Sequence, residues 1–227
     1  MKRLLLLTGF TLTLLQASAQ LQPKSYFATL NGGIDSRIDG RDNKFNFYQF
    51  STSLSQMASD KWAIGIFAEH GRGISETETT SEISSQNMSY YKYYKQKRSD
   101  WQTGLLSRFY YPIKQQLYVF GEGRAGVMYE ASESEYLNSS YVISNPENTT
   151  AKSGGSEKSS ALSVNAVIAP GITYFPNTTI GLELKLNLLH YNHDLDNSAS
   201  PKGTEHPHNF SADFGLSSVR AGASFYF

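Results

Sequence analysis

The sequence predicts an all-β protein: a membrane-spanning, antiparallel, up-and-down β-barrel of eight strands, with short turns at one end and long loops at the other. Three observations carry this prediction. Apolar and polar residues alternate with a period of two in eight separate segments. Each segment has about the 9–11 residues that a tilted strand needs to cross a bilayer. The connections between segments are alternately short and long, which is typical of transmembrane β-barrels.

Composition narrows the possible function classes. A chain of 227 residues suits one domain, and 20 basic against 20 acidic residues argue against nucleic acid as the main partner. The absence of cysteine excludes disulfides, thiol nucleophiles and thiolate metal sites. A mean hydropathy of -0.41 excludes a helical membrane protein. It does not exclude a barrel, because the average combines an apolar lipid face with a polar lumen and polar loops.

Residues 1–19 have the pattern of a secretory signal peptide. Two basic residues precede an apolar run from Leu4 to Leu15, and the small-residue site Ala17-Ser18-Ala19 follows. A transmembrane anchor is the alternative, but the run is shorter than the roughly 20 residues that a helix needs to span a bilayer. We therefore expect cleavage after Ala19, export, and a mature barrel domain over residues 20–227.

The alternation is clearest at residues 180–188, where Ile180 and four leucines alternate with small or polar residues. A strand sends successive side chains to opposite faces, whereas a helix would scatter these leucines around its axis. The alternation slips between Leu216 and Val219, which predicts a bulge near Ser217. In chain order, we expect strands at 26–34, 45–55, 62–70, 101–111, 117–129, 162–174, 180–188 and 210–227.

The connections form two sets. The short ones are 57–61, 112–115 and 176–178, and the long ones are 35–44, 71–99, 130–160 and 192–208. Aromatic residues near the strand ends predict girdles at the two membrane interfaces: Tyr26, Trp62, Tyr110, Tyr111, Tyr174, Phe175, Phe225 and Phe227. The alternative is a secreted soluble sandwich. The regular change in loop length, the lack of disulfides in an exported chain and the aromatic carboxyl terminus favour the barrel.

Five short runs give the sequence a resemblance to a known class of proteins. They are Asp60-Lys61-Trp62-Ala63-Ile64-Gly65, Arg108-Phe109-Tyr110-Tyr111-Pro112, Phe120-Gly121-Glu122-Gly123, Pro170-Gly171-Ile172-Thr173-Tyr174-Phe175 and Ala223-Ser224-Phe225-Tyr226-Phe227. With these runs the mature chain resembles the small eight-stranded outer-membrane barrels grouped with OmpX and the OmpA transmembrane domain, in the versions common in Bacteroidetes-like bacteria. The resemblance is specific for architecture and weak for activity.

The resemblance implies an integral protein of the bacterial outer membrane, surrounded by outer-membrane lipid and lipopolysaccharide. It also implies that the barrel-assembly machinery recognises the last strand during biogenesis. In such families the signal is a terminal phenylalanine preceded by alternating apolar residues. The positions that match it here are Val219, Ala221, Ala223, Phe225 and Phe227.

Charged residues on the polar faces of the predicted strands form the first candidate site. Strand parity places three acids and four bases in the lumen: Glu69, Arg108, Glu122, Arg124, Glu183, Lys185 and Arg220. An eight-stranded barrel has room inside for little beyond side chains, and ions away from bulk water must pair. We expect a salt-bridged plug that closes the barrel. The alternative is a narrow conductive pathway.

The long connection at 71–99 carries the second candidate site, in which tyrosines alternate with lysines: Tyr91, Tyr93, Lys95 and Lys97. Such a pattern can stack on sugars while its cations hold phosphates, so a contact with lipopolysaccharide or a host glycan is one hypothesis. The other is a strand that protrudes above the membrane with an ordinary amphipathic surface. The connection at 130–160 is polar and rich in Gly and Ser, and it predicts a mobile loop.

Histidines bear on catalysis and metal binding, because some small outer-membrane barrels modify lipid A. In lipid A deacylases of this shape, a His-x-Ser pair acts with an acid, and none of the five histidines here has Ser two residues on. The residues around the last long connection could in principle bind Zn²⁺: His190, His193, Asp194, Asp196, His206 and His208. Surface solvation explains them more simply, and we expect neither metal, cofactor nor enzyme activity.

The functional prediction is a monomeric outer-membrane barrel with a structural or interaction role. That role would be membrane integrity, surface adhesion or host contact through the extracellular loops. A small solute pore is the second hypothesis, and a lipid A-modifying enzyme is the third.

Overall fold

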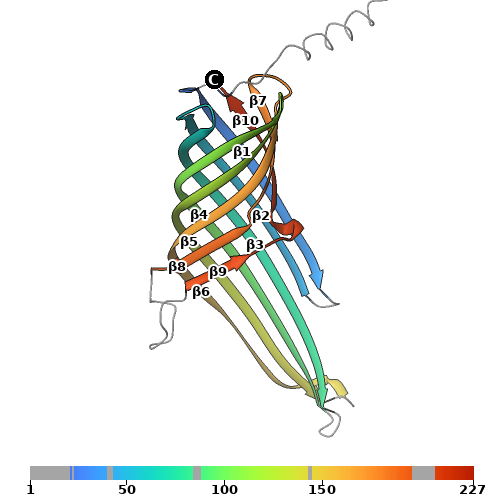
Figure 1. Cartoon of the computed structure of the whole chain (residues 1–227). Coiled ribbons are helices and arrows are strands. Elements are labelled where there is room, and N and C mark those ends of the chain that lie inside the picture. Colours follow the sequence, from blue (N-terminus) through green and yellow to red (C-terminus); the bar gives the residue numbers. More distant parts are fainter. Residues whose placement is uncertain (1–20, 22, 40–42, 84–87, 143–144, 196–207) are drawn as a thin grey trace, which may run out of the picture.

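The strands of the computed structural model form one closed wall (Figure 1). The structure describes residues 21, 23–39, 43–83, 88–142, 145–195 and 208–227, so the predicted signal peptide at 1–19 lies outside the described residues. Within the described ranges, no helix has the length and apolar character to span a membrane. The elements are β1 (Tyr26–Asp39), β2 (Asn43–Met57), β3 (Trp62–Ile83), β4 (Met88–Lys114), β5 (Leu117–Val142), β6 (Asn145–Tyr174), β7 (Ile180–Leu186), β8 (Leu189–Asp194), β9 (His208–Ala212), the 3-10 helix η3 (Leu216–Ser218) and β10 (Val219–Tyr226).

Antiparallel pairing closes the ring. Strands β1 to β6 pair in chain order, β6 pairs with both β7 and β8, and β10 lies between β7 and β1. Strands β7 and β8 are two parts of one wall strand, and β9 and β10 are two parts of the next, so the ring has eight strands. The predicted eight-stranded antiparallel barrel is confirmed. Closure pairs the backbone groups of every wall strand, as lipid requires.

The last two wall strands are irregular. Along β6, Gly171 pairs with Lys185 but Ile168 pairs with Leu189, which leaves one extra residue between β7 and β8, a bulge. A larger break separates β9 from β10, where the chain leaves the sheet through η3. The sequence predicted a bulge near Ser217. The structure instead shows a longer excursion, in which the Asp213 carboxylate accepts a hydrogen bond from the Gly215 amide at 2.7 Å.

The connections 35–44, 71–99 and 130–160 lie at one end of the barrel, and their described residues are mostly β-strand. Most of the connection 192–208 lies outside the described residues. Strands β3 and β4 stay in register from Trp62 opposite Phe109 out to Ile83 opposite Met88. The long connection 71–99 is therefore a hairpin, which confirms the hypothesis of a strand that protrudes beyond the barrel wall. The segment 130–160, predicted as a mobile loop, instead belongs to β5 and β6. Their polar composition gives no alternating apolar pattern that would predict strands. The strands form nevertheless, because cross-strand pairing outweighs intrinsic β-propensity. We call these parts the extension: residues 72–83, 88–99, 131–142 and 145–160.

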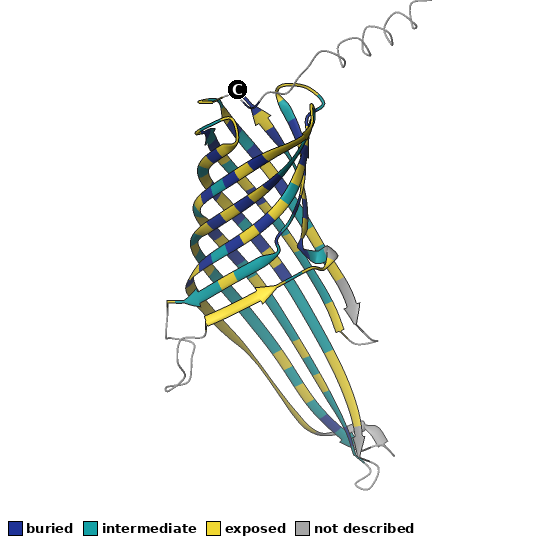
Figure 2. Cartoon of the chain, viewed as in Figure 1, coloured by how far each residue is buried: buried dark blue, intermediate teal, exposed yellow. Residues whose placement is uncertain are grey.

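The barrel has the reverse polarity of a soluble protein. Outward-facing Leu105 and Ile66 are 69% and 58% exposed, whereas inward-facing Arg108 and Glu122 are 1% and 2% exposed. Figure 2 shows the resulting alternation of buried and exposed residues along each wall strand. An exposed apolar belt around a buried polar interior indicates that lipid covers the outside.

Exposed aromatic side chains border the belt at both ends. At the short-turn end they include Tyr111 and Tyr174, and at the extension end Trp101 and Tyr129. The girdle prediction was wrong for Tyr110 and Phe175, which are 0% and 1% exposed and lie inside the barrel. Each of them is next in sequence to an outward-facing tyrosine. One step along a strand changes the face on which a side chain lies.

Tyr110 and Phe175 belong to an aromatic cluster that fills the lumen at the short-turn end. Phe27 stacks on Tyr226 with ring centroids 4.7 Å apart, and Phe175 meets Tyr226 edge-on at 5.2 Å. Tyr118 packs edge-on against Phe175 at 5.4 Å. Met57, Ala63 and Phe120 are buried with them. This end of the lumen is therefore a packed hydrophobic core.

Candidate functional site

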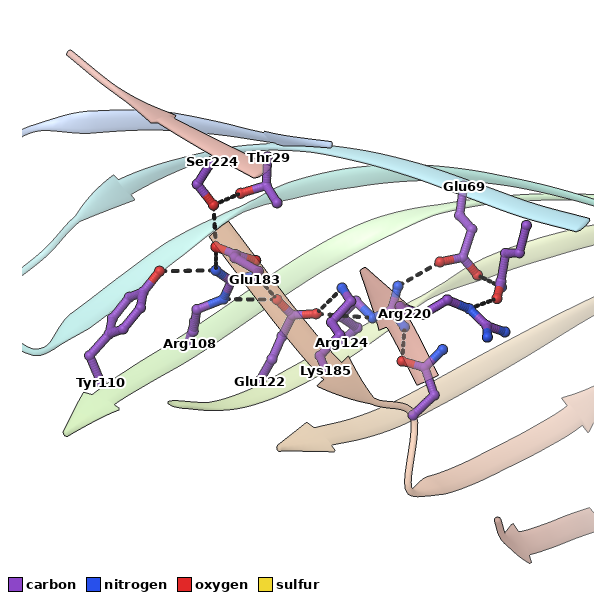
Figure 3. A network of polar contacts seen from close by, with 12 residues as sticks. Thr29, Glu69, Arg108, Tyr110, Glu122, Arg124, Glu183, Lys185, Arg220 and Ser224 are labelled. Carbon is purple, nitrogen blue, oxygen red and sulfur yellow. Dashed lines mark hydrogen bonds and ion pairs between the residues drawn. The ribbon is translucent and has the colours of Figure 1, made fainter. Parts of the chain in front are cut away.

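The seven charged residues that strand parity assigned to the lumen lie there, at mid-height in the barrel. They come from β3, β4, β5, β7 and β10, and each is between 1% and 8% exposed. Figure 3 shows the side chains converging from these strands into one network of polar contacts. These strands lie on different sides of the barrel wall, so the network links parts of the chain that are far apart in sequence.

Arg108 is the centre of the half of the network nearest the aromatic cluster. Its Nε and Nη2 donate to Glu122 Oε2 at 2.9 and 2.5 Å, and its Nη1 donates to Glu183 Oε1 at 2.7 Å. Nη1 also donates to the Tyr110 hydroxyl at 2.9 Å, and the guanidinium lies 4.3 Å from the centre of the Phe120 ring. Arg108 therefore joins the ionic network to the hydrophobic core beneath it.

The other half of the network is built around Arg124. Its Nη1 donates to Glu69 Oε2 at 2.6 Å and its Nη2 to Asn187 Oδ1 at 3.0 Å. Glu122 connects the two halves, since its Oε1 accepts from Lys185 Nζ at 2.9 Å and lies 3.4 Å from Arg124 Nε. The result is a continuous network across the lumen.

Neutral side chains complete the network, and the sequence reading missed them. The Gln49 amide donates to Glu69, and its oxygen accepts from Arg220 Nε at 2.5 Å. Arg220 also donates to the backbone oxygen of Ser217 at 2.6 Å, so it is held by neutral acceptors and not by a carboxylate within 4 Å among the described residues. Gln49 belongs to the polar face of the segment 45–55, but an uncharged side chain does not by itself predict a place in an ionic network.

The network can hold strands together and can close the lumen. Burying ions is costly unless each is paired and hydrogen-bonded. Here the Arg108 guanidinium donates to two carboxylates, and both oxygens of the Glu122 carboxylate accept hydrogen bonds. A continuous aqueous path would leave the lumenal side chains accessible to solvent. Arg108, Tyr110 and Phe27 are at most 1% exposed.

Beyond Arg124 the lumen opens toward the extension into a polar cavity of about 400 Å³, which we call the vestibule. Arg98 Nη2 lies 3.0 Å from Glu130 Oε2, and Arg98 Nε lies 3.7 Å from Asp100 Oδ1. Asp100 has the same strand parity as Arg108, and that rule could have found it. It was missed because the strand was expected to begin at Trp101.

The surface candidates Tyr91, Tyr93, Lys95 and Lys97 all lie on the part of β4 within the extension. Lys95 Nζ is 2.6 Å from Glu76 Oε1, and Lys97 Nζ is 2.9 Å from Glu135 Oε1. The hydrogen bond from Lys95 holds the pKa of Glu76 below its usual value, and that from Lys97 does the same for Glu135. Carboxylates on neighbouring strands thus already balance both ammonium groups.

The predicted assembly signal lies at the end of the chain, beside β1. Val219, Phe225 and Phe227 are 36%, 47% and 71% exposed on the lipid-facing side, and Ala221 and Ala223 share their strand parity. The Phe227 amide donates to the Tyr26 carbonyl at 2.9 Å. The recognition of this segment by assembly machinery stays a prediction.

The histidines near the last long connection form a small stack. The rings of His193 and His208 are 4.5 Å apart. Among residues placed by the structure, no group of three His, Asp or Glu side chains could hold a metal ion. Asp196 and His206, named with them in the sequence, lie outside the described ranges.

Comparisons with known proteins return similar structures only. No family model and no curated protein matches the chain. The N-terminal β-barrel domain of Pseudomonas aeruginosa OprF is 11% identical, with 91% of this chain and 100% of that one covered and a TM-score of 0.36. The attachment invasion locus protein Ail of Yersinia pestis, in complex with the heparin analogue sucrose octasulfate, is 11% identical, with 91% and 99% covered and a TM-score of 0.34.

The outer-membrane protein OprG of Pseudomonas aeruginosa is 14% identical, with 92% of this chain and 99% of that one covered and a TM-score of 0.36. At such identities the likeness concerns the fold alone. All three are small outer-membrane β-barrels of the OmpA/OmpX type, the class that the sequence resembles.

Proposed function

We propose that this chain is an integral protein of the bacterial outer membrane, exported with a cleaved signal peptide, and that its role is structural and interactive. One observation carries the proposal: the apolar wall encloses a lumen that buried side chains fill, with Arg108 1% and Tyr110 0% exposed. Such a barrel suits membrane integrity better than transport. The short turns would face the periplasm, and the extension would present a polar surface outside the cell.

The partners follow from the two surfaces. Outer-membrane lipid, including lipopolysaccharide, would cover the apolar belt, and the barrel-assembly machinery would bind the strand that ends at Phe227. The extension would meet a host or glycan ligand. Closure of the wall leaves no strand edge in the membrane for a second copy, which favours a monomer.

In planar bilayers, the purified protein is expected to show no stepwise conductance, because the Arg108 network and the aromatic cluster fill the lumen in series. Single-channel recording in 1 M KCl would measure this. Arg124→Ala, which removes a side chain only from the network, should also stay silent while the aromatic cluster remains packed. Uniform current steps from the wild-type protein, reduced or enlarged in Arg124→Ala, would instead establish a solute pore.

Substituting the extension tyrosines, Tyr91→Ser with Tyr93→Ser, is expected to reduce the binding of soluble glycans to cells that display the protein. Aromatic rings provide the faces on which sugars stack, whereas Lys95 and Lys97 are paired to carboxylates. The paired substitution Lys95→Gln with Lys97→Gln should therefore have the smaller effect. Glycan binding would then be measured on intact cells for a variant that combines all four substitutions. If this variant binds as well as the wild type, the contact role is removed and the structural role remains.

A further inference from the structure

The vestibule has a closed floor. Arg124, Glu69, Gln49 and Arg220 bond to one another across the lumen at its base, and the Arg108 half of the network and the aromatic cluster lie beneath them. A cavity of about 400 Å³ above such a floor cannot pass a solute on. It has the size of a small-molecule site.

The vestibule carries an excess of negative charge. Its lining includes five acidic side chains and three arginines. Glu69 and Glu130 are paired with Arg124 and Arg98, and the Asp213 carboxylate accepts from the Gly215 amide and the Ser217 hydroxyl. Five carboxylates against three arginines leave the lining with a net negative charge, which attracts a cation.

Asp100 is the least satisfied of these acids. The residue is 5% exposed, and its Oδ1 is buried without a hydrogen-bond partner among the described residues. Its nearest cation, Arg98 Nε, is 3.7 Å away, and that guanidinium is committed to Glu130 at 3.0 Å. A buried carboxylate oxygen without a donor is costly, so the position favours a ligand that donates.

A second acceptor without a partner lines the same cavity. Asn192 Oδ1 is also buried without a hydrogen bond in the part of the chain that the structure describes, while its amide nitrogen donates to Asp194 at 3.0 Å. Gln102, two residues beyond Asp100, donates at 2.5 Å to Asn165 of β6, the strand on the other side of β5, and Asn165 is the cross-strand partner of Asn192. Both orphan oxygens belong to residues that line the vestibule.

The neighbouring strand makes room for the Asp100 carboxylate. A Cβ placed on Gly71 of β3 would lie 2.6 Å from Asp100 Oδ2, so only glycine lets the carboxylate lie against that strand. Gly71 and Asp100 are cross-strand partners. The position of the Asp100 carboxylate in the cavity therefore depends on the glycine at position 71.

We propose that the vestibule binds a small organic ammonium ion, whose N–H groups donate to Asp100 and whose charge balances the acidic excess of the cavity. A primary ammonium has three donors and no acceptor, which matches the unpartnered carboxylate oxygen of Asp100. A bare metal ion fits less well, because no three His, Asp or Glu side chains in the described ranges are placed to bind one. This site goes beyond the proposed structural role and does not depend on it.

The test is a titration of the purified full-length barrel in nanodiscs, by calorimetry or by NMR shifts of vestibule amides. The probes are 1,4-diaminobutane, neutral 1,4-butanediol and dianionic succinate, which have four-carbon chains and differ in charge. We expect saturable binding of the diamine only. Asp100→Asn keeps the side-chain shape and should weaken binding about tenfold or more, the worth of a hydrogen bond to a charged group. Gly71→Ala should weaken it by displacing the carboxylate.

The matched control is Glu76→Gln, which removes a carboxylate from the extension surface outside the vestibule and should leave binding unchanged. Equal binding of the diol, preferred binding of succinate, or no saturable binding to the wild type would each overturn the proposal. So would an equal loss in Glu76→Gln and Asp100→Asn, since that result means diffuse attraction. If Asp100→Asn does not fold, Gly71→Ala and the three-probe comparison on the wild type still decide.

Discussion

Replacing Arg108 with methionine is expected to lower the free energy of unfolding by about 3–5 kcal/mol, the cost of removing one partner from a buried ionic pair. Methionine keeps much of the side-chain volume, so the effect reports the charge. Without the guanidinium, Glu183 keeps its bond from Ser224, and Glu122 keeps Lys185. Urea unfolding of the barrel in lipid vesicles, followed by the fluorescence of Trp62 and Trp101, would measure the change.

Lys97→Met is the matched control on the same strand. Lys97 also contacts two carboxylates, at 2.9 and 3.9 Å, but its side chain is 39% exposed, and exposed pairs contribute only about 0–1 kcal/mol. Adding Glu183→Gln to Arg108→Met should recover part of the loss, because it removes a charge that the first substitution left buried. If Arg108→Met costs no more than Lys97→Met, the network is not what holds the strands together.

The wall of the barrel could be predicted from sequence because one face of every strand meets lipid. Segments such as 180–188 combine four leucines on one face with Glu183 and Lys185 on the other, and the period of two is then unmistakable. The same parity located the charged residues of the lumen. It needed no knowledge of which strand neighbours which.

The extension and the vestibule could not be predicted in this way. Beyond the membrane both faces of β3 to β6 meet water, so residues 72–83 and 131–142 show no apolar stripe and resemble loops. Asp100 lies where the apolar pattern ends, one residue before the expected strand. The bonds of Gln49 and Arg220 join strands that are distant in sequence, and a pattern along one strand carries no information about its contacts across the lumen.

Aromatic residues at the strand ends lie on both faces of the wall, because adjacent residues of a strand point to opposite sides. Phe175→Ala is expected to destabilise the barrel by about 3–5 kcal/mol, the usual cost of truncating a buried aromatic side chain to alanine. Phe175 is 1% exposed, between Tyr118 and Tyr226. Its loss would leave a cavity in the core at the short-turn end. The same unfolding experiment would measure it.

The neighbouring substitution, Tyr174→Ala, is the control because it changes an aromatic residue one step along the chain. Tyr174 is 45% exposed on the outer wall, and its hydroxyl is 3.4 Å from Gln116, so its removal opens no internal cavity and should cost far less. If the two costs were equal, or if Tyr174→Ala cost more, Phe175 would belong to the interface girdle. The lumen would then lack the packed base that closes it beneath Arg108.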